Sequence, residues 1–178
     1  MTIPAFDPSR HYVALPSPQD AEVFDVADPF HPGIAPLAIL ERRQIVFFHH
    51  PDWDGDVWRE VLQAYLQAFS ADQEVSLVFW LDPMQGVSIE EATRRVLEVM
   101  AVIGVSPDEA PDLILVPDVL DLAGLASLYA AADYVLPGED DVQAGRARKL
   151  GRRVVSALSA ELLRDVAHSH RGEPVHDA

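Results

Sequence analysis

The chain has 178 residues, of which 49% are hydrophobic, with 29 acidic residues, 13 basic residues and no cysteine. This size and composition indicate one globular domain and exclude a mainly disordered chain. The net charge of −16 argues against nucleic acid and anionic membranes as partners, because both attract basic surfaces. Without cysteine there is no disulfide framework, and no apolar run reaches the roughly 20 residues of a transmembrane segment, so we expect a cytoplasmic protein.

The first 40 residues are rich in proline and lack a sustained period, so we expect an extended lead-in with one short strand at residues 11–15. A single domain is expected over residues 41–170 and a flexible tail over residues 171–178. Buried-type strands are expected at residues 44–48, 75–81, 112–116, 134–137 and 153–157. Helices are expected at residues 57–69, 88–104, 121–132, 142–150 and 160–168, with fraying from His168 onward.

Strands that are almost continuously apolar and alternate with helices predict a parallel sheet with both faces covered. The predicted fold class is therefore α/β, a Rossmann-like three-layer α/β/α domain with a mostly parallel sheet. Such sheets bind ligands at the carboxyl ends of their strands. The candidate turns are residues 49–55, 82–87, 117–121 and 137–142.

The turn after the first domain strand reads HHPDWDG. His49, His50 and Asp52 are residue types that ligate zinc, but adjacent histidines on a continuing strand point in opposite directions, so we expect no metal site. His50 could act as a general base because imidazole titrates near neutral pH, although the sequence identifies no partner for it. The plainer interpretation is a polar strand end with Trp53 and Trp58 packed beneath the turn.

Longer segments carry a family resemblance. They read LPSPQDAEVFDVADP at residues 15–29, WREVLQAYLQAFSADQEVSLVFW at residues 58–80, PDLILVPDVLDLAGLASLYAAADYVLP at residues 111–137 and KLGRRVVSA at residues 149–157. In order and spacing they resemble the C-terminal domain of retaining GT-B-type glycosyltransferases, together with the linker that precedes it. The resemblance implies one half of a GT-B fold that holds a nucleoside-diphosphate sugar and requires no further cofactor.

The resemblance also implies which positions face this donor. The catalytic candidates are Glu139, through its place in the family pattern, and His50. The implied donor-binding positions are His49, His50, Asp52 and Gly55 in the first turn, Val116, Pro117 and Asp118 near the base, and Gly138, Glu139, Asp140 and Arg146 near the sugar and phosphates.

The charged positions depart from the family pattern. The lysine and arginine that hold the diphosphate in the family fall here at Asp56 and at about Pro51, and the second glutamate falls at Arg146. Asp56, as the expected helix cap, would also occupy the amides that an anion needs. A carboxylate within a few ångströms of a phosphate costs on the order of 1–4 kcal/mol per charge pair. The first turn therefore resembles a phosphate site that has lost its cations.

We interpret the chain as a glycosyltransferase-like donor domain with a degenerate site, working with a separate acceptor-binding domain or lacking transfer activity. The alternative is an acidic, non-catalytic interaction or oligomerisation module that keeps the fold, for example as a homo-oligomer. The chain could also be part of a longer enzyme. Arg146 and Lys149 belong to a basic cluster that is either a solvated helix face or a phosphate site.

Overall fold

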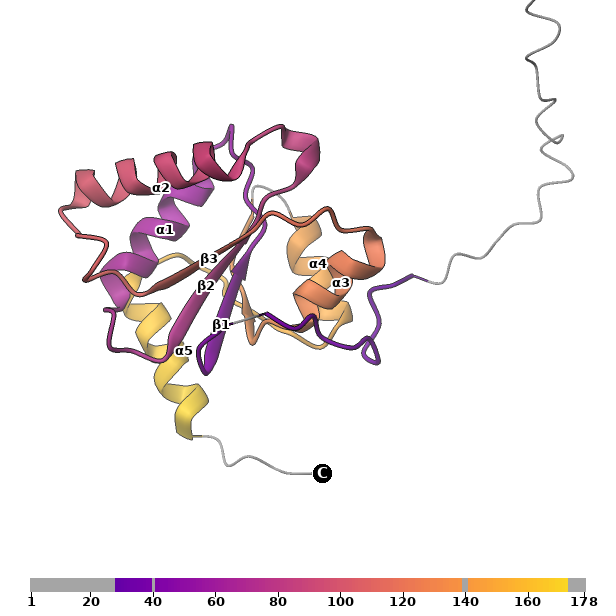
Figure 1. Ribbon diagram of the computed structural model, residues 1–178. Helices are drawn as coiled ribbons and strands as arrows, with labels where there is room; N and C mark the ends of the chain where they lie inside the picture. Colours follow the sequence, from indigo (N-terminus) through magenta and orange to yellow (C-terminus); the bar gives the residue numbers. More distant parts are fainter. Residues whose placement is uncertain (1–27, 40, 139–140, 173–178) are drawn as a thin grey trace, which may run out of the picture.

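The structure is a computed structural model, and it describes residues 28–39, 41–138 and 141–172. A five-stranded, all-parallel sheet with the order β3-β2-β1-β4-β5 forms its centre (Figure 1). This confirms the predicted α/β Rossmann-like class, and the order is the one in which doubly wound dinucleotide-binding sheets arrange these strands. The strands are β1 (Ile45–His49), β2 (Val75–Trp80), β3 (Asp112–Val116), β4 (Tyr134–Val135) and β5 (Arg153–Val154).

Helices cover both faces of the sheet. Helices α1, α2 and α5 pack on one face, and α3 and α4 on the other (Figure 1). No helix within the described residues is long and apolar enough to cross a membrane. The helices are α1 (Val57–Ala68), the short 3-10 helix η2 (Pro83–Gln85), α2 (Ile89–Ile103), α3 (Leu122–Ala130), α4 (Asp141–Lys149) and α5 (Ala160–Gly172).

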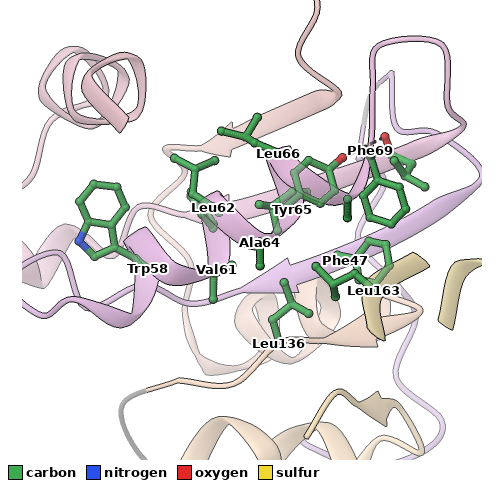
Figure 2. Close-up of a cluster of buried hydrophobic side chains, with 14 of the residues drawn as sticks. Phe47, Trp58, Val61, Leu62, Ala64, Tyr65, Leu66, Phe69, Leu136 and Leu163 are labelled. Carbon is green, nitrogen blue, oxygen red and sulfur yellow. Dashed lines mark hydrogen bonds between the residues drawn. The ribbon is translucent and has the colours of Figure 1, made fainter. Parts of the chain in front are cut away.

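The alternation of side chains along β1 divides the core into two clusters. Phe47 faces α1 and α5, whereas Phe48 faces α3 and stacks edge-on against Tyr129. Figure 2 shows the first cluster, in which the inner face of α1 packs with Phe47, Leu136 and Leu163. Burial of each large apolar side chain contributes about 1.5–3 kcal/mol to the stability of the fold. This packing fixes the positions of the carboxyl ends of the strands.

The structure corrects two expectations about element ends. Asp56 stands at the N-cap of α1, but its carboxylate accepts a hydrogen bond from Arg59 (2.7 Å) and makes no cap to the helix amides. Helix α5 continues to Gly172, so the chain does not fray at His168. Ser88, in contrast, caps α2 as expected by accepting from the Glu91 amide (3.2 Å).

Part of the proline-rich lead-in packs against the domain. The Leu37 amide donates to the Ser127 carbonyl (2.8 Å), and the Phe30 ring lies edge-on to Tyr129 at 5.7 Å. Residues 28–39 therefore help to cover α3. The strand expected at residues 11–15, Glu139, Asp140 and residues 173–178 lie outside the described residues.

Candidate functional site

A pocket of about 420 Å³ opens at the carboxyl end of the sheet. From β1 the chain builds the sheet outward through β2 and β3, and then returns to place β4 on the other side of β1. Ligands of open α/β sheets bind at this reversal of strand order, and a volume of roughly 300–1,000 Å³ is typical. We call it the switch-point pocket. Its lining consists of His50, Pro51, Asp52, Asp82, Gln85, Val142, Gln143 and Arg146.

Gln143 on α4 ties the end of β1 to the opposite wall of this pocket. Its side-chain carbonyl accepts from the His50 amide (3.2 Å), and its NH2 group donates to the His50 carbonyl (2.5 Å). Gly138 makes room for this contact, since a Cβ built there would lie 2.3 Å from Gln143 Nε2. The buried glutamine therefore fixes the position at which β1 ends.

Two further side chains hold the turn that follows. Gln85 accepts from the Trp53 amide (2.9 Å) and donates to the Pro51 carbonyl (2.8 Å). The Arg95 guanidinium donates to the Trp53 carbonyl (2.8 Å). Below the turn, Trp53 and Trp58 are 1% exposed with ring centroids 4.8 Å apart, which confirms that they pack beneath it.

These hydrogen bonds determine which backbone amides of the turn remain available to bind an anion. The amides of His50 and Trp53 are occupied by the two glutamines, and the amides of Asp54 and Gly55 donate to the Asp52 side chain and carbonyl (3.1 and 3.2 Å). A phosphate would have to break these bonds to be held by the same amides. The turn is thus organised by the protein's own side chains, which differs from a turn that cradles phosphates with free amides.

His50 and Asp82 form a facing pair inside the pocket. His50 Nε2 lies 3.5 Å from Asp82 Oδ2, with both side chains largely buried, and the imidazole tilts against the Trp80 ring at 4.7 Å. Asp82 is the partner that the sequence does not identify for His50. A carboxylate beside an imidazole orients the ring, so the pair presents polar atoms in a fixed arrangement to a bound ligand.

His49 occupies a different environment from its neighbour. It is 1% exposed, packs edge-on against Phe79 at 5.6 Å, and neither ring nitrogen has a hydrogen-bond partner of ordinary geometry. Burial lowers the pKa of His49 to about 3; the charge of His50 acts in the same direction, and the Pro137 backbone weakly opposes it. The two histidines point apart as expected, and no three His, Asp or Glu side chains of the described chain come together to hold a metal ion.

Arg146 provides the cationic group of the pocket wall. It lies on α4, and its guanidinium sits over the Phe30 ring at 5.1 Å. Asp52 and Asp82 line the same pocket, so one guanidinium is set against two carboxylates. A pocket with one cationic and two anionic side chains can bind hydroxyl and amide groups of a ligand. Because the carboxylates repel anions, it accommodates one negative charge better than two.

The remaining predicted positions are distributed around this pocket. His50, Asp52 and Arg146 line it, Gly138 lies behind Gln143, and His49 and Gly55 contribute structure rather than pocket surface. Val116 ends β3, and Pro117 and Asp118 follow it at the same edge of the sheet, where the Asp118 carbonyl accepts from the Trp80 indole (3.0 Å). The Trp80 ring therefore lies between the expected base position and His50.

Five residues that line or support the pocket carry no functional signal in the sequence. They are Asp82, Gln85, Arg95, Val142 and Gln143. A glutamine has no local sequence signature when it bonds a backbone group 93 residues away, as Gln143 does with His50. The one available signal was the proximity of the first, second and fourth candidate turns that a parallel sheet imposes.

No protein-family model matches the sequence, and no curated protein matches it.

Proposed function

We propose that the chain is a glycosyltransferase-like donor domain that binds a nucleoside-diphosphate sugar in the switch-point pocket and does not transfer the sugar by itself. The observation that carries the proposal is the position of Arg146 opposite His50 and Asp82, in a pocket at the reversal of strand order. The resemblance of residues 15–157 to donor domains supplies the ligand class.

The lining suggests how such a donor would lie. A phosphate next to Arg146 gains a charge-assisted hydrogen bond, and sugar hydroxyls can donate to Asp52 or Asp82 and exchange hydrogen bonds with the Gln85 amide. Because the amides of His50, Trp53, Asp54 and Gly55 already donate to the protein, the second phosphate gains little from them. We therefore expect weak binding, with a dissociation constant on the order of 1 mM.

Calorimetric or NMR titration with uridine, guanosine and adenosine diphosphate sugars tests the proposal. Arg146→Ala should weaken binding about tenfold to a hundredfold, because a charged hydrogen bond contributes about 1.5–3 kcal/mol. Arg148→Ala is the matched control, since Arg148 lies on the same helix and lines a neighbouring hollow instead. Flat titrations for all three donors at millimolar concentration would refute the proposal, as would equal losses in both variants.

A second candidate is a non-catalytic interaction module that keeps the fold. The observation in its favour is the β1–α1 turn, whose amides are satisfied by Gln85, Gln143 and Asp52 rather than left for a ligand. This candidate predicts no thermal shift with any nucleotide sugar, together with a protein partner or self-association in sedimentation experiments.

A further inference from the structure

Strand β3 is an edge strand of a kind that natural sheets usually protect. The strand order places β3 at one end of the sheet and β5 at the other. Strand β5 has two residues and begins with Arg153, features that blunt an edge. Strand β3 has the sequence DLILV, with no lysine, proline or glycine, and Figure 1 shows helices on the two faces of the sheet but none across β3. Among the described residues, no segment pairs with its outer edge.

The hydrogen-bond pattern identifies the backbone groups on this edge. The Leu81 amide donates to the Val116 carbonyl (2.9 Å), so Val116 directs its backbone groups toward β2. Since alternate residues of a strand face opposite sides, the N–H and C=O groups of Leu113 and Leu115 point outward. Within the described part of the chain, no hydrogen bond reaches these groups.

Apolar side chains accompany this open edge. Leu113, Ile114 and Leu115 remain partly exposed although they belong to the sheet. Val119, in the turn after β3, is 81% exposed. A strand added along β3 would find apolar surface near both of its own faces.

The acidic residues around β3 indicate which kind of strand can pair with its edge. Residues 96–145 contain ten acidic residues and no lysine or arginine. Asp108 and Glu109 precede β3, and Asp118 and Asp121 follow it, all four exposed. An antiparallel pairing of β3 with a second copy would bring these acidic ends together, and like charges at close range repel. A strand with basic ends would be attracted at both ends.

We propose that the β3 edge receives an extended segment of a partner protein, apolar at alternate positions and flanked by lysine or arginine, which adds a sixth strand to the sheet. Main-chain hydrogen bonds to Leu113 and Leu115 supply the docking, and the acidic flanks supply the selectivity. This surface is separate from the switch-point pocket, so binding here does not depend on a nucleotide sugar.

A labelled peptide KKVTITVKK, capped at both ends, tests the proposal by fluorescence anisotropy and by amide hydrogen exchange of the full chain. The expected result is salt-sensitive binding with slower exchange at Leu113 and Leu115. The peptides EEVTITVEE and KKVTPTVKK should fail to bind, because the first carries the wrong charge and the second has a proline in the strand. Binding of the acidic peptide, binding without protection at Leu113 and Leu115, or no binding of KKVTITVKK would overturn the proposal.

Variants of the protein separate the contribution of the acidic flanks from that of the main-chain hydrogen bonds. Asp108→Asn/Asp118→Asn should weaken the basic peptide about threefold to tenfold, whereas Glu161→Gln/Asp165→Asn on α5, with the same change in net charge, should not. Leu115→Pro removes an outward N–H and should abolish binding, with its fold checked by circular dichroism; if it does not fold, the charge variants decide alone. A dimer of the unmodified chain that Leu115→Pro dissociates would overturn the proposal by assigning the edge to a second copy.

Discussion

Gly138 and Gln143 provide a sharp test of how the switch-point pocket is built. Gly138→Ala introduces a methyl group 2.3 Å from Gln143 Nε2 and 2.5 Å from its Cδ, distances that side chains do not tolerate. Gly138 does not adopt a positive φ, so alanine is compatible with the backbone. The cost must therefore come from pushing the Gln143 side chain out of its two hydrogen bonds to His50.

The magnitude follows from those two bonds. Each contributes about 0.5–1.5 kcal/mol net, so losing both should lower the free energy of unfolding by about 1–3 kcal/mol. Gln143→Ala should cost a similar amount because it removes the same bonds. Once Gln143 is truncated, the added methyl group has nothing to displace. The double variant should therefore be about as stable as Gln143→Ala alone, with a coupling energy of about 1–3 kcal/mol.

Urea unfolding followed by circular dichroism on the four proteins of this cycle measures the coupling. The slope of the free energy with denaturant should be unchanged, so that the midpoint reports stability. Additive losses, with the double variant less stable by the sum of the two single changes, would refute the reasoning. Additive losses would mean that Gly138 is needed for a reason other than making room for the Gln143 side chain.

Two further predictions concern buried polar groups. His49 has a folded-state pKa lowered from 6.5 to about 3 by burial, so the unfolded chain binds a proton that the folded chain excludes, and stability falls as the pH drops from about 6.5 toward 3. His49→Leu should flatten the decline of the urea midpoint between about pH 7.5 and about pH 4.5, and an undiminished decline would contradict this account. Tyr65→Phe removes the hydroxyl shared by the Val75 and Asp112 carbonyls (3.2 and 2.8 Å) and should cost about 1–2 kcal/mol in urea unfolding; a neutral result would show that these carbonyls lose nothing.

The fold was predictable because its strongest signals are local. The run Ile45–His49 is buried along its whole length, and the expected strand at residues 112–116 has the same bounds as β3. Strands β4 and β5 have two residues each and are shorter than expected, because their ladder extends only over Tyr134 and Val135. Beyond those residues the Leu136 amide still donates to the Phe48 carbonyl (2.8 Å), while its apolar side chain packs in the core.

The candidate site was predictable in place but not in chemistry. Parallel strands bring their carboxyl ends to one edge, so the turn at His50 could be assigned to a pocket from the order of elements. Its partners Asp82 and Gln143 come from other strands and helices, and no sequence spacing relates them. Asp56 illustrates the same limit at short range, because its carboxylate prefers the Arg59 guanidinium one helical turn away to the amides it was expected to cap.

The central claim is that the switch-point pocket receives a nucleoside-diphosphate sugar. An NMR titration of the isotope-labelled chain with such a donor tests it most directly. If the pocket binds the donor, chemical-shift changes should be concentrated at His50, Gln85, Val142 and Arg146. At the same donor concentration these changes should shrink strongly in Arg146→Ala and persist in Arg148→Ala. Shifts confined to surfaces away from this pocket, or a spectrum unchanged at millimolar donor, would contradict it.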